Sequence, residues 1–197
     1  MSELATLTLA DAGDAREIAE MSRDLVEQGL TWSWIPARVN HFIRGADSSV
    51  VVARRSGAPS SSARHSNSLR GNGRHSNARR SDTWRGDARR GDARRGDARH
   101  IAAFAIMHFG DEVAHLNLLA VAPQYRRQGL GRQLMEWLTT TAIEAGVFRI
   151  DLELRTQNGQ ARAFYESLGY AELDVVQGYY QGREAALRMS RRLGFTP

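Results

Sequence analysis

A stretch of low sequence complexity interrupts the chain and determines which residues can form a core. Residues 56–99 contain the string RHSN twice and the string RGDAR three times, the latter with a period of five. Apolar side chains are almost absent there, apart from small alanines, Leu69 and Trp84. Such a stretch buries too little surface to offset the roughly 1–2 kcal/mol per residue that ordering a backbone costs. We therefore expect residues 56–99 to be a disordered insertion within one domain that comprises residues 1–197.

The insertion also carries the positive charge of the chain. The formal net charge is +5, but residues 54–99 hold 13 arginines against 4 aspartates, whereas the rest holds 14 arginines against 18 acidic residues. The part that can fold is therefore mildly acidic. Because arginine-rich segments contact anionic nucleic acid, a weak contact of residues 56–99 with RNA or the ribosome stays open.

Two amino acids are missing, and their absence excludes whole classes of chemistry. Without cysteine, the chain has no disulfide, thiolate nucleophile or zinc ribbon. Without lysine, it cannot form a GxxxxGK[ST] phosphate loop. His65, His75 and His100 lack the spacing of metal ligands, so no metal site is expected.

The sequence shows neither a signal peptide nor a membrane helix. The N-terminal stretch has early acidic residues and lacks the apolar centre of a signal peptide. No apolar run approaches the roughly 20 residues that a membrane helix needs. We therefore expect a cytoplasmic protein with no membrane partner.

Outside the insertion, the hydrophobic periodicity alternates between that of strands and that of helices. Strands are expected at 4–9, 48–55, 100–109, 113–123, 148–155, 170–176 and 184–193. Helices are expected at 11–28 with Asp11 as N-cap, at 36–45, from Gly129 to Gly146, and from the cap Asn158 to Gly169.

The order of these elements predicts the fold class. Residues 100–109 are apolar on both faces, which is typical of a buried central strand, and we expect 48–55 to be its antiparallel neighbour. The order β-α-α-β-β-β-α-β-α-β-β predicts an α/β (α+β) fold, in which helices flank a mixed, twisted sheet of six to seven strands.

The stretch PQYRRQGLGRQLMEWL, residues 123–138, places arginines and glycines directly before an amphipathic helix. The positive end of the helix dipole lies there, and free backbone N–H groups point out of it. Gly129 and Gly131 would let a ligand approach the backbone closely. One interpretation is a cradle for an anion such as phosphate, and the other is a solvated, arginine-rich helix start. A dinucleotide-binding GxGxxG is excluded, because its third glycine would fall at Leu134.

These residues resemble the GNAT superfamily of acetyl-CoA-dependent N-acetyltransferases. The string RRQGLG (126–131) fits its [RQ]-x-x-G-x-[GA] motif, and LNLLAVAP, LELRTQNGQARAFYESLGY and GYYQGREAALRM extend the similarity over about residues 101–190. Within the superfamily, the chain is most similar to bacterial ribosomal-protein N-terminal acetyltransferases. Residues 28–45 do not look like that branch, and this part shapes the acceptor pocket in GNAT enzymes. The resemblance therefore predicts a GNAT-like fold and the type of reaction. It is less informative about which amine accepts the acetyl group.

Carried over to this chain, the resemblance implies an acetyl-CoA site and two catalytic side chains. Asn158 and the backbone of three strand residues would contact the cofactor arm: Leu119, Ala120 and Val121. The loop before the helix would bind the pyrophosphate through Arg126, Arg127, Gln128, Gly129, Leu130, Gly131 and Arg132. Tyr165 would donate a proton to the leaving thiolate, and Glu153 would be the general base. A water relay near His115 and Asn117 is the alternative base.

The expected activity is N-acetyl transfer to a protein N-terminal α-amine or a small-molecule amine. Direct attack of the amine on the thioester needs no acetylated residue, which fits a chain without cysteine and without a G-x-S-x-G motif. Two alternatives stay open: an acetyl-CoA-binding module without catalysis, and a protein that associates with nucleic acid or the ribosome through its insertion. A homodimer is also open.

Overall fold

One seven-stranded sheet organises the residues that the structure, a computed structural model, describes, namely 5–55 and 100–194. The predicted insertion at 56–99 lies outside the described residues, so its disorder stays a prediction. The strands stand in the order β1-β2-β3-β4-β5-β7-β6. Neighbouring strands pair antiparallel except β4 and β5, which are parallel. In chain order the elements are β1 (Thr6–Leu9), α1 (Ala15–Leu25), α2 (Pro36–Arg44), β2 (Ser48–Arg55), β3 (His100–Phe109), β4 (Val113–Val121), the 3-10 helix η1 (Pro123–Tyr125), α3 (Leu130–Glu144), β5 (Arg149–Arg155), α4 (Gly159–Glu166), β6 (Ala171–Tyr180) and β7 (Glu184–Arg192).

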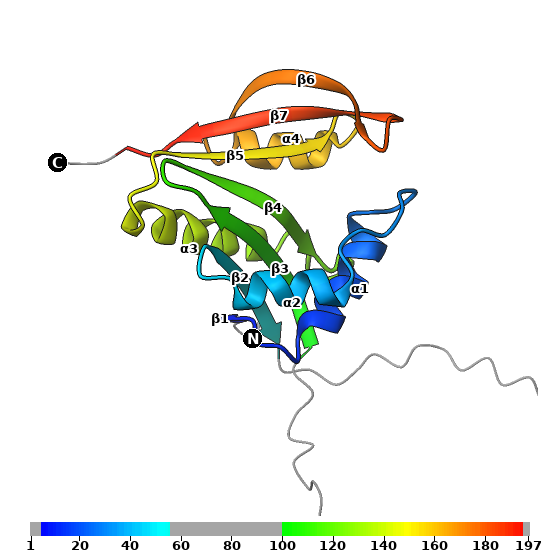
Figure 1. Ribbon diagram of the computed structural model, residues 1–197, viewed down its shortest axis with the longest axis vertical. Coiled ribbons are helices and arrows are strands. Elements are labelled where there is room, and N and C mark those ends of the chain that lie inside the picture. The colour runs from blue at the N-terminus through cyan, green and yellow to red at the C-terminus, as the bar shows by residue number, and fades with distance from the viewer. Residues whose placement is uncertain (1–4, 56–99, 195–197) are drawn as a thin grey trace, which may run out of the picture. The chain divides into compact units, whose positions relative to one another are not determined.

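The predicted order of strands and helices is confirmed, with only η1 added. Helices α1 and α2 cover one face of the sheet, here called the α1–α2 face, and α3 and α4 cover the other (Figure 1). Strand β3 is buried on both faces as predicted, because Phe104 and Ile106 join the core under α1 and α2, whereas Ala105 and Met107 join the core under α3. Strands β2 and β3 are antiparallel neighbours, which was also expected.

Strands β4 and β5 pair over a short length and then separate. Their parallel ladder joins 113–116 to 149–152 and ends at Leu116 and Leu152. Beyond this point the two strands diverge in Figure 1. The second half of β4 therefore has a paired strand, β3, on one edge only.

A β-bulge in β4 reverses which side chains face each helix layer. Ile106 pairs with Leu118 and Met107 with Leu116, so Asn117 is the extra residue. As a result Leu116 packs on the α3–α4 side, and Leu118 packs under α1 and α2. His115 precedes the bulge and points to the α1–α2 face, together with polar side chains of β5.

The start of α1 differs from the prediction. The helix begins at Ala15 with Asp14 at the N-cap, so the expectation that Asp11 caps it is wrong. The Asp11 carboxylate instead accepts from the Gly13 N–H at 2.7 Å, and the Asp11 N–H donates to Asp14 Oδ2 at 2.8 Å. This local turn uses the carboxylate that the cap would need. Arg54 on β2 contacts Asp14 at 2.6 Å and ties the turn to the sheet.

Two other boundaries follow from local backbone geometry. Asn158 caps α4 as predicted, because its Oδ1 accepts from the Ala161 N–H at 3.1 Å. Strand β6 continues to Tyr180 rather than ending at 176. A register shift between Val176 and Tyr180, with Gly178 at a φ of 65°, lets the strand pass through a bulge and go on.

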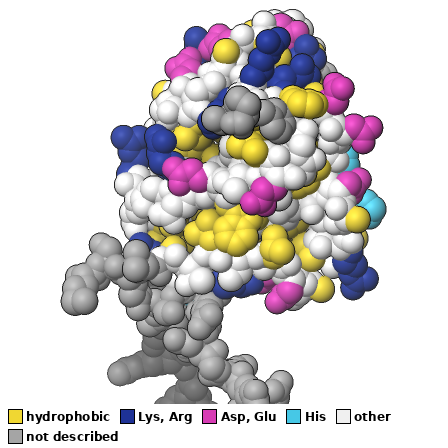
Figure 2. Space-filling model, turned by 90° about the vertical axis from the view of Figure 1, so that its left-hand side faces the viewer, with side chains coloured by type: hydrophobic (Ala, Val, Ile, Leu, Met, Phe, Trp, Pro, Cys, Tyr) yellow, Lys and Arg dark blue, Asp and Glu magenta, His cyan; other side chains and the backbone are white. Residues whose placement is uncertain are grey.

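The described surface carries charges of both signs. Figure 2 shows acidic and basic side chains interspersed over one face, with apolar side chains between them. None of the helices within 5–55 and 100–194 has the length and hydrophobicity of a membrane-crossing helix.

Candidate active site

A pocket of about 430 Å³, here called the main pocket, is formed by the end of β4, the loop before α3, and α4. Every predicted cofactor residue except Gln128 lines it. The Gln128 side chain donates a hydrogen bond to the Gln124 carbonyl at 3.1 Å, within its own loop. The catalytic candidate Tyr165 lines the same pocket, so the structure brings the predicted loop, strand end and tyrosine together.

The loop of residues 126–132 owes its shape to residues with positive φ. Arg127 has a φ of 61°, and Gly129, the residue before α3, has a φ of 83°. A side chain at Gly129 would be strained by this backbone, although among the described residues beyond its chain neighbours the atom nearest to an added Cβ is Gln133 Nε2 at 3.8 Å. Gly129 is therefore required by backbone geometry, and the space beside it is open.

Gly131 is explained by packing as well. A Cβ added there would lie 3.2 Å from Cζ of the Phe164 ring and 3.7 Å from Cγ2 of Val121. The glycine thus permits close contact between the start of α3 and the aromatic side chain of α4. This contact, which the sequence did not predict, sets one wall of the main pocket.

The arginines of the loop are available to an anion. Within the described part of the chain, Arg127 and Arg132 have no carboxylate partner. Arg126 Nε donates to the Val121 carbonyl at 3.1 Å, which holds this side chain against the end of β4. Together with the free N–H groups at the start of α3, these guanidinium groups make the loop end of the main pocket electropositive.

Tyr165 is the most buried polar side chain of the main pocket. It is 7% exposed, and its ring contacts those of Phe164 and Tyr170, with centroids 5.1 and 5.6 Å away. Burial raises the pKa of the Tyr165 hydroxyl well above its usual value. The phenol is therefore protonated throughout the physiological range, which suits a proton donor rather than a base.

Glu153 lies on the other face of the sheet and does not line the main pocket. Its side chain is 14% exposed, and its Oε2 lies 2.9 Å from Nε2 of His115 on β4. The hydrogen bond to Glu153 raises the pKa of His115, burial opposes this rise, and the charges of Glu153 and Asp151 add to it. Asn117, the other relay candidate, has a buried Oδ1 without a hydrogen-bond partner among the described residues.

The two candidate bases are thus one hydrogen-bonded pair. From the sequence, His115 and Glu153 were expected on separate strands, and they were considered as alternative candidates for the general base. Their contact depends on the parallel register of β4 and β5, in which His115 lies opposite Asp151 and next to Glu153. Only the alternation of polar residues on β5 hinted that these side chains share one face.

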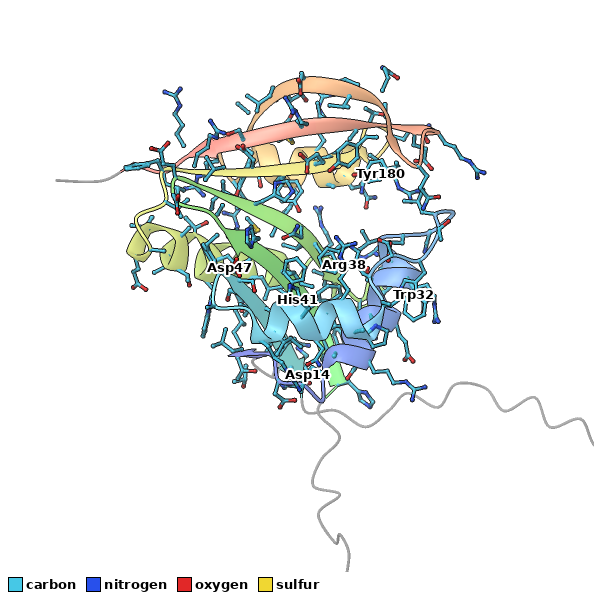
Figure 3. The ribbon with its side chains drawn as sticks, in the orientation of Figure 1. Asp14, Trp32, Arg38, His41, Asp47 and Tyr180 are labelled. Atoms are coloured by element: carbon cyan, nitrogen blue, oxygen red, sulfur yellow. The ribbon has the colours of Figure 1, made fainter. Side chains whose placement is uncertain are left out.

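Contacts from β5 and from the turn after β6 fix the loop between α1 and α2. Arg155 of β5 donates to the Gln28 carbonyl at 2.7 Å, and the Gln181 amide donates to the Thr31 carbonyl at 3.2 Å. In Figure 3, Tyr180 lies on the side of β5 and β7, whereas Trp32 and Arg38 lie on the side of α1 and α2.

Glu27 organises the same loop from inside, and no pattern in the sequence pointed to it. The residue is 7% exposed. Its carboxylate accepts the N–H groups of Ser33 at 2.8 Å and Trp34 at 3.2 Å, and the hydroxyl of Ser22 at 3.3 Å. These bonds fix residues 27–34, which include the start of the region 28–45 that departs from the resemblance noted in the sequence.

Comparison with known proteins gives a consistent result at the level of sequence. Residues 70–170 match the profile described as "Acetyltransferase (GNAT) family". The [Ribosomal protein bS18]-alanine N-acetyltransferase of Escherichia coli (strain K12) is 44% identical over 93 residues, which are 46% of this chain and 63% of that protein. The N-terminal acetyltransferase B complex catalytic subunit naa20 of Schizosaccharomyces pombe is 41% identical over 66 residues, 34% of this chain and 37% of that protein. The matches thus span less than two thirds of these relatives.

Solved structures share the fold over nearly the whole chain. The ribosomal-protein-S18-alanine N-acetyltransferase from Escherichia coli superimposes with a TM-score of 0.66 and 24% identity, covering 98% of this chain and 97% of that chain. Ard1 from Thermoplasma volcanium gives 0.67 at 18% identity, with 98% and 99% covered. Arabidopsis thaliana NAA60 in complex with acetyl-CoA gives 0.68 at 11% identity, with 96% and 98% covered. At these identities the likeness establishes the fold.

Proposed function

Because the chain belongs to the Acetyltransferase (GNAT) family, we propose that it transfers the acetyl group of acetyl-CoA directly to a primary amine. The observation that carries this proposal is the main pocket, in which an electropositive loop, a strand end with one unpaired edge and a buried phenol converge. The loop of residues 126–132 would hold the pyrophosphate, and Asn158 and the backbone of 119–121 would hold the pantetheine arm. When bound, acetyl-CoA supplies the thioester that the amine attacks.

The residues fit this ligand on grounds of charge and space. Arg127 and Arg132 lack a carboxylate partner among the described residues, so their charge can balance phosphate. Gly129 leaves open space at the start of α3. The second half of β4 has no ladder partner toward β5, so its backbone can pair with an extended arm. Gln128 would act through the loop's conformation, since its amide is bonded within the loop.

The chemistry assigned to Glu153 and Tyr165 is proton transfer. Deprotonating a lysine amine of pKa about 10.4 at pH 7 costs about 4.6 kcal/mol, and an α-amine near 8 costs only about 1.4 kcal/mol. The pair of Glu153 and His115 would take this proton from the amine. Tyr165 would hold a proton at the leaving sulfur, which its raised pKa supports. No residue becomes acetylated, in keeping with the absence of cysteine.

The acceptor we propose is the α-amine of a protein N-terminus. The lower cost of deprotonating an α-amine favours it, and the names of the relatives, an alanine N-acetyltransferase and an N-terminal acetyltransferase subunit, support it. A small-molecule amine is the second candidate, favoured by the departure of residues 28–45 from the ribosomal-protein branch. A cytoplasmic location, a homodimer and a contact of residues 56–99 with RNA or the ribosome stay predictions.

Thiol release from acetyl-CoA tests the proposal directly. The purified chain is incubated with acetyl-CoA and a panel of N-terminal peptides, polyamines and aminoglycosides. We expect acceptor-dependent release of the CoA thiol with peptides that have a free α-amine, and none with the same peptides blocked at that amine. A chain that binds acetyl-CoA but releases no thiol with any acceptor would instead be a binding module without catalysis.

A further inference from the structure

A second pocket of about 380 Å³, here called the histidine pocket, opens on the α1–α2 face beside the Glu153–His115 pair. Its wall includes His41 of α2, His108 of β3, and His115 and Asn117 of β4. The described residues contain no group of three or more histidine, cysteine or acidic side chains arranged to hold a metal ion.

The register of the sheet aligns the titratable side chains into a row. His108 on β3 lies directly opposite His115 on β4, and both point to the α1–α2 face. Such cross-strand neighbours have Cβ atoms about 4.5–5.5 Å apart. At one end of the row, Glu153 lies 2.9 Å from His115 Nε2, and at the other end Asp47 lies 3.6 Å from His108 Nδ1. The row thus crosses from β5 to the residue that precedes β2.

Exposure rises steadily along this row. The exposed fraction of the side chain is 14% for Glu153, 35% for His115, 45% for His108 and 66% for Asp47. The buried end is the proposed base, and the open end is a solvated carboxylate. The row therefore has a direction, from the base toward water.

We propose that the row Glu153–His115–His108–Asp47 carries the proton lost by the acceptor amine out of the site through the histidine pocket. The proposal rests on the proposed acetyl transfer. It gives His108 and Asp47, which lie outside the main pocket, a role in proton transfer. Accepting a single proton from the amine would require only Glu153. A base enclosed at 14% exposure must also be reset after each turnover, and the row supplies that path.

The proton balance of the path is as follows. The ammonium proton of the acceptor moves to the Glu153 carboxylate. His115 donates its Nε2–H to the Glu153 carboxylate, so the proton that its imidazolium form releases to pocket water or His108 is the one on Nδ1. The carboxyl proton of Glu153 then reaches the vacated Nδ1 through pocket water, which restores the carboxylate and the imidazolium. One proton enters the row and one leaves it to solvent, and no electrons are exchanged.

The groups around His115 support both steps. Glu153 and Asp151 of β5 face it from one side, and Asp151 is itself held by Arg149 at 2.9 Å. His108 and His41 face it from β3 and α2. The resulting rise in the pKa of His115 favours uptake of the proton from Glu153. An imidazole titrates near neutral pH, so it can also release that proton in each cycle.

Two further groups act on the carboxylate end of the row. Burial, the charge of Glu153 and a hydrogen bond with the Glu153 carboxylate raise the pKa of Tyr179 on β6, so this phenol stays neutral and keeps its proton. Arg188 on β7 is held by Asp174 through two hydrogen bonds of 2.6 and 2.8 Å, and it feels the charge of Glu153 at longer range. Neither group competes with His115 for the proton.

Rescue by a diffusible base tests the path. In His115→Ala we expect kcat at neutral pH to fall at least roughly tenfold, with the KM for acetyl-CoA unchanged, and added imidazole to restore much of it. In His108→Ala the loss should be smaller and also restored by imidazole. The control His100→Ala removes a histidine at the opposite end of β3, near Glu17, and should neither lose activity nor respond to imidazole.

The outcomes are separable from those of the proposed function. Failure of the wild-type chain to acetylate any acceptor would overturn the function, whereas normal turnover of both histidine variants in an active enzyme would overturn the path alone. A loss in kcat that imidazole does not restore, or one accompanied by a higher KM for acetyl-CoA, would mean that the histidines are structural. If His115→Ala does not fold, His115→Gln replaces it.

A measurement without turnover completes the test. NMR titration of His115 in the wild-type chain should give a midpoint above that of an ordinary histidine. Glu153→Gln should lower that midpoint, and His108→Ala should shift it because the neighbouring imidazole is removed. If neither substitution changes the titration midpoint of His115, the side chains of the row are not electrostatically coupled.

Discussion

Replacing Gly129 by alanine should separate backbone strain from ligand binding, because the chain offers a matched control. Gly129 and Gly146 have φ values of 83° and 79°, and in neither case does an added Cβ meet a crowded neighbour. Each alanine should therefore cost about 1–2 kcal/mol of the free energy of unfolding through strain alone. For a domain of this size, a loss of 1 kcal/mol lowers the Tm by about 2–4 °C.

The two variants should differ once acetyl-CoA is added. Gly129 lines the main pocket and Gly146 does not, so only alanine at 129 places a methyl group beside the proposed pyrophosphate and turns the adjacent N–H groups away. At a ligand concentration of 100 times the Kd, binding stabilises the fold by about 2.7 kcal/mol, and a tenfold weaker Kd leaves about 1.4 kcal/mol. The acetyl-CoA-induced shift in Tm should thus fall to about half in Gly129→Ala and stay complete in Gly146→Ala.

Thermal unfolding with and without acetyl-CoA measures both effects, and titration calorimetry gives the Kd. The reasoning is refuted if Gly129→Ala keeps the full acetyl-CoA shift while showing the expected loss in Tm. It is refuted equally if Gly146→Ala loses the shift, because the effect would then follow from instability rather than from the pocket.

Four other perturbations have defined outcomes. Tyr165→Phe keeps the packing and removes the proton donor, so stopped-time assays should show kcat lower by roughly 100-fold with the acetyl-CoA Kd unchanged; normal turnover would exclude this residue as the acid. Glu27→Gln removes a buried charge that accepts several hydrogen bonds, so urea denaturation should show a loss of at least about 1.5 kcal/mol; a stability within error of wild type would contradict this role. Because the hydrogen bond to Glu153 raises the pKa of His115, its contribution to stability should be complete below about pH 6.5 and lost as the pH rises through the raised value; Glu153→Gln should remove this pH dependence of urea unfolding. Deleting 57–98 and joining the paired ends of β2 and β3 by a short turn should keep small-amine turnover and save about 2 kcal/mol of loop closure; loss of turnover, or strong hydrogen-exchange protection of 57–98 in the full chain, would refute the insertion hypothesis.

Local patterns were sufficient to predict the sequence of elements. Each strand and helix was recognisable from periodicity and from capping residues such as Asn158, whose bond to the Ala161 N–H spans three residues. The error at Asp11 arose because two aspartates stand three residues apart and each could cap the helix. In the structure Asp14 contacts Arg54, a partner from a distant strand that the local pattern does not reveal.

The candidate site could be predicted from the sequence only where its residues are contiguous in the chain. Residues 126–132 are contiguous, so their loop could be read as one anion cradle. The pair of His115 and Glu153, by contrast, requires the register of two strands and a bulge at Asn117 that reverses the alternation of side chains. Glu27 gave no signal, because a buried carboxylate that accepts backbone N–H groups looks like any surface acid in the sequence.

Mass spectrometry of a single reaction mixture tests direct acetyl transfer most directly. The purified chain is incubated with acetyl-CoA carrying an isotope-labelled acetyl group and a peptide that begins with alanine, and both the peptide and the protein are then analysed. We predict the label on the α-amine of the peptide, none on the protein, and a loss of labelling in Tyr165→Phe. A labelled side chain on the protein, or an unlabelled peptide despite bound acetyl-CoA, would contradict the proposal.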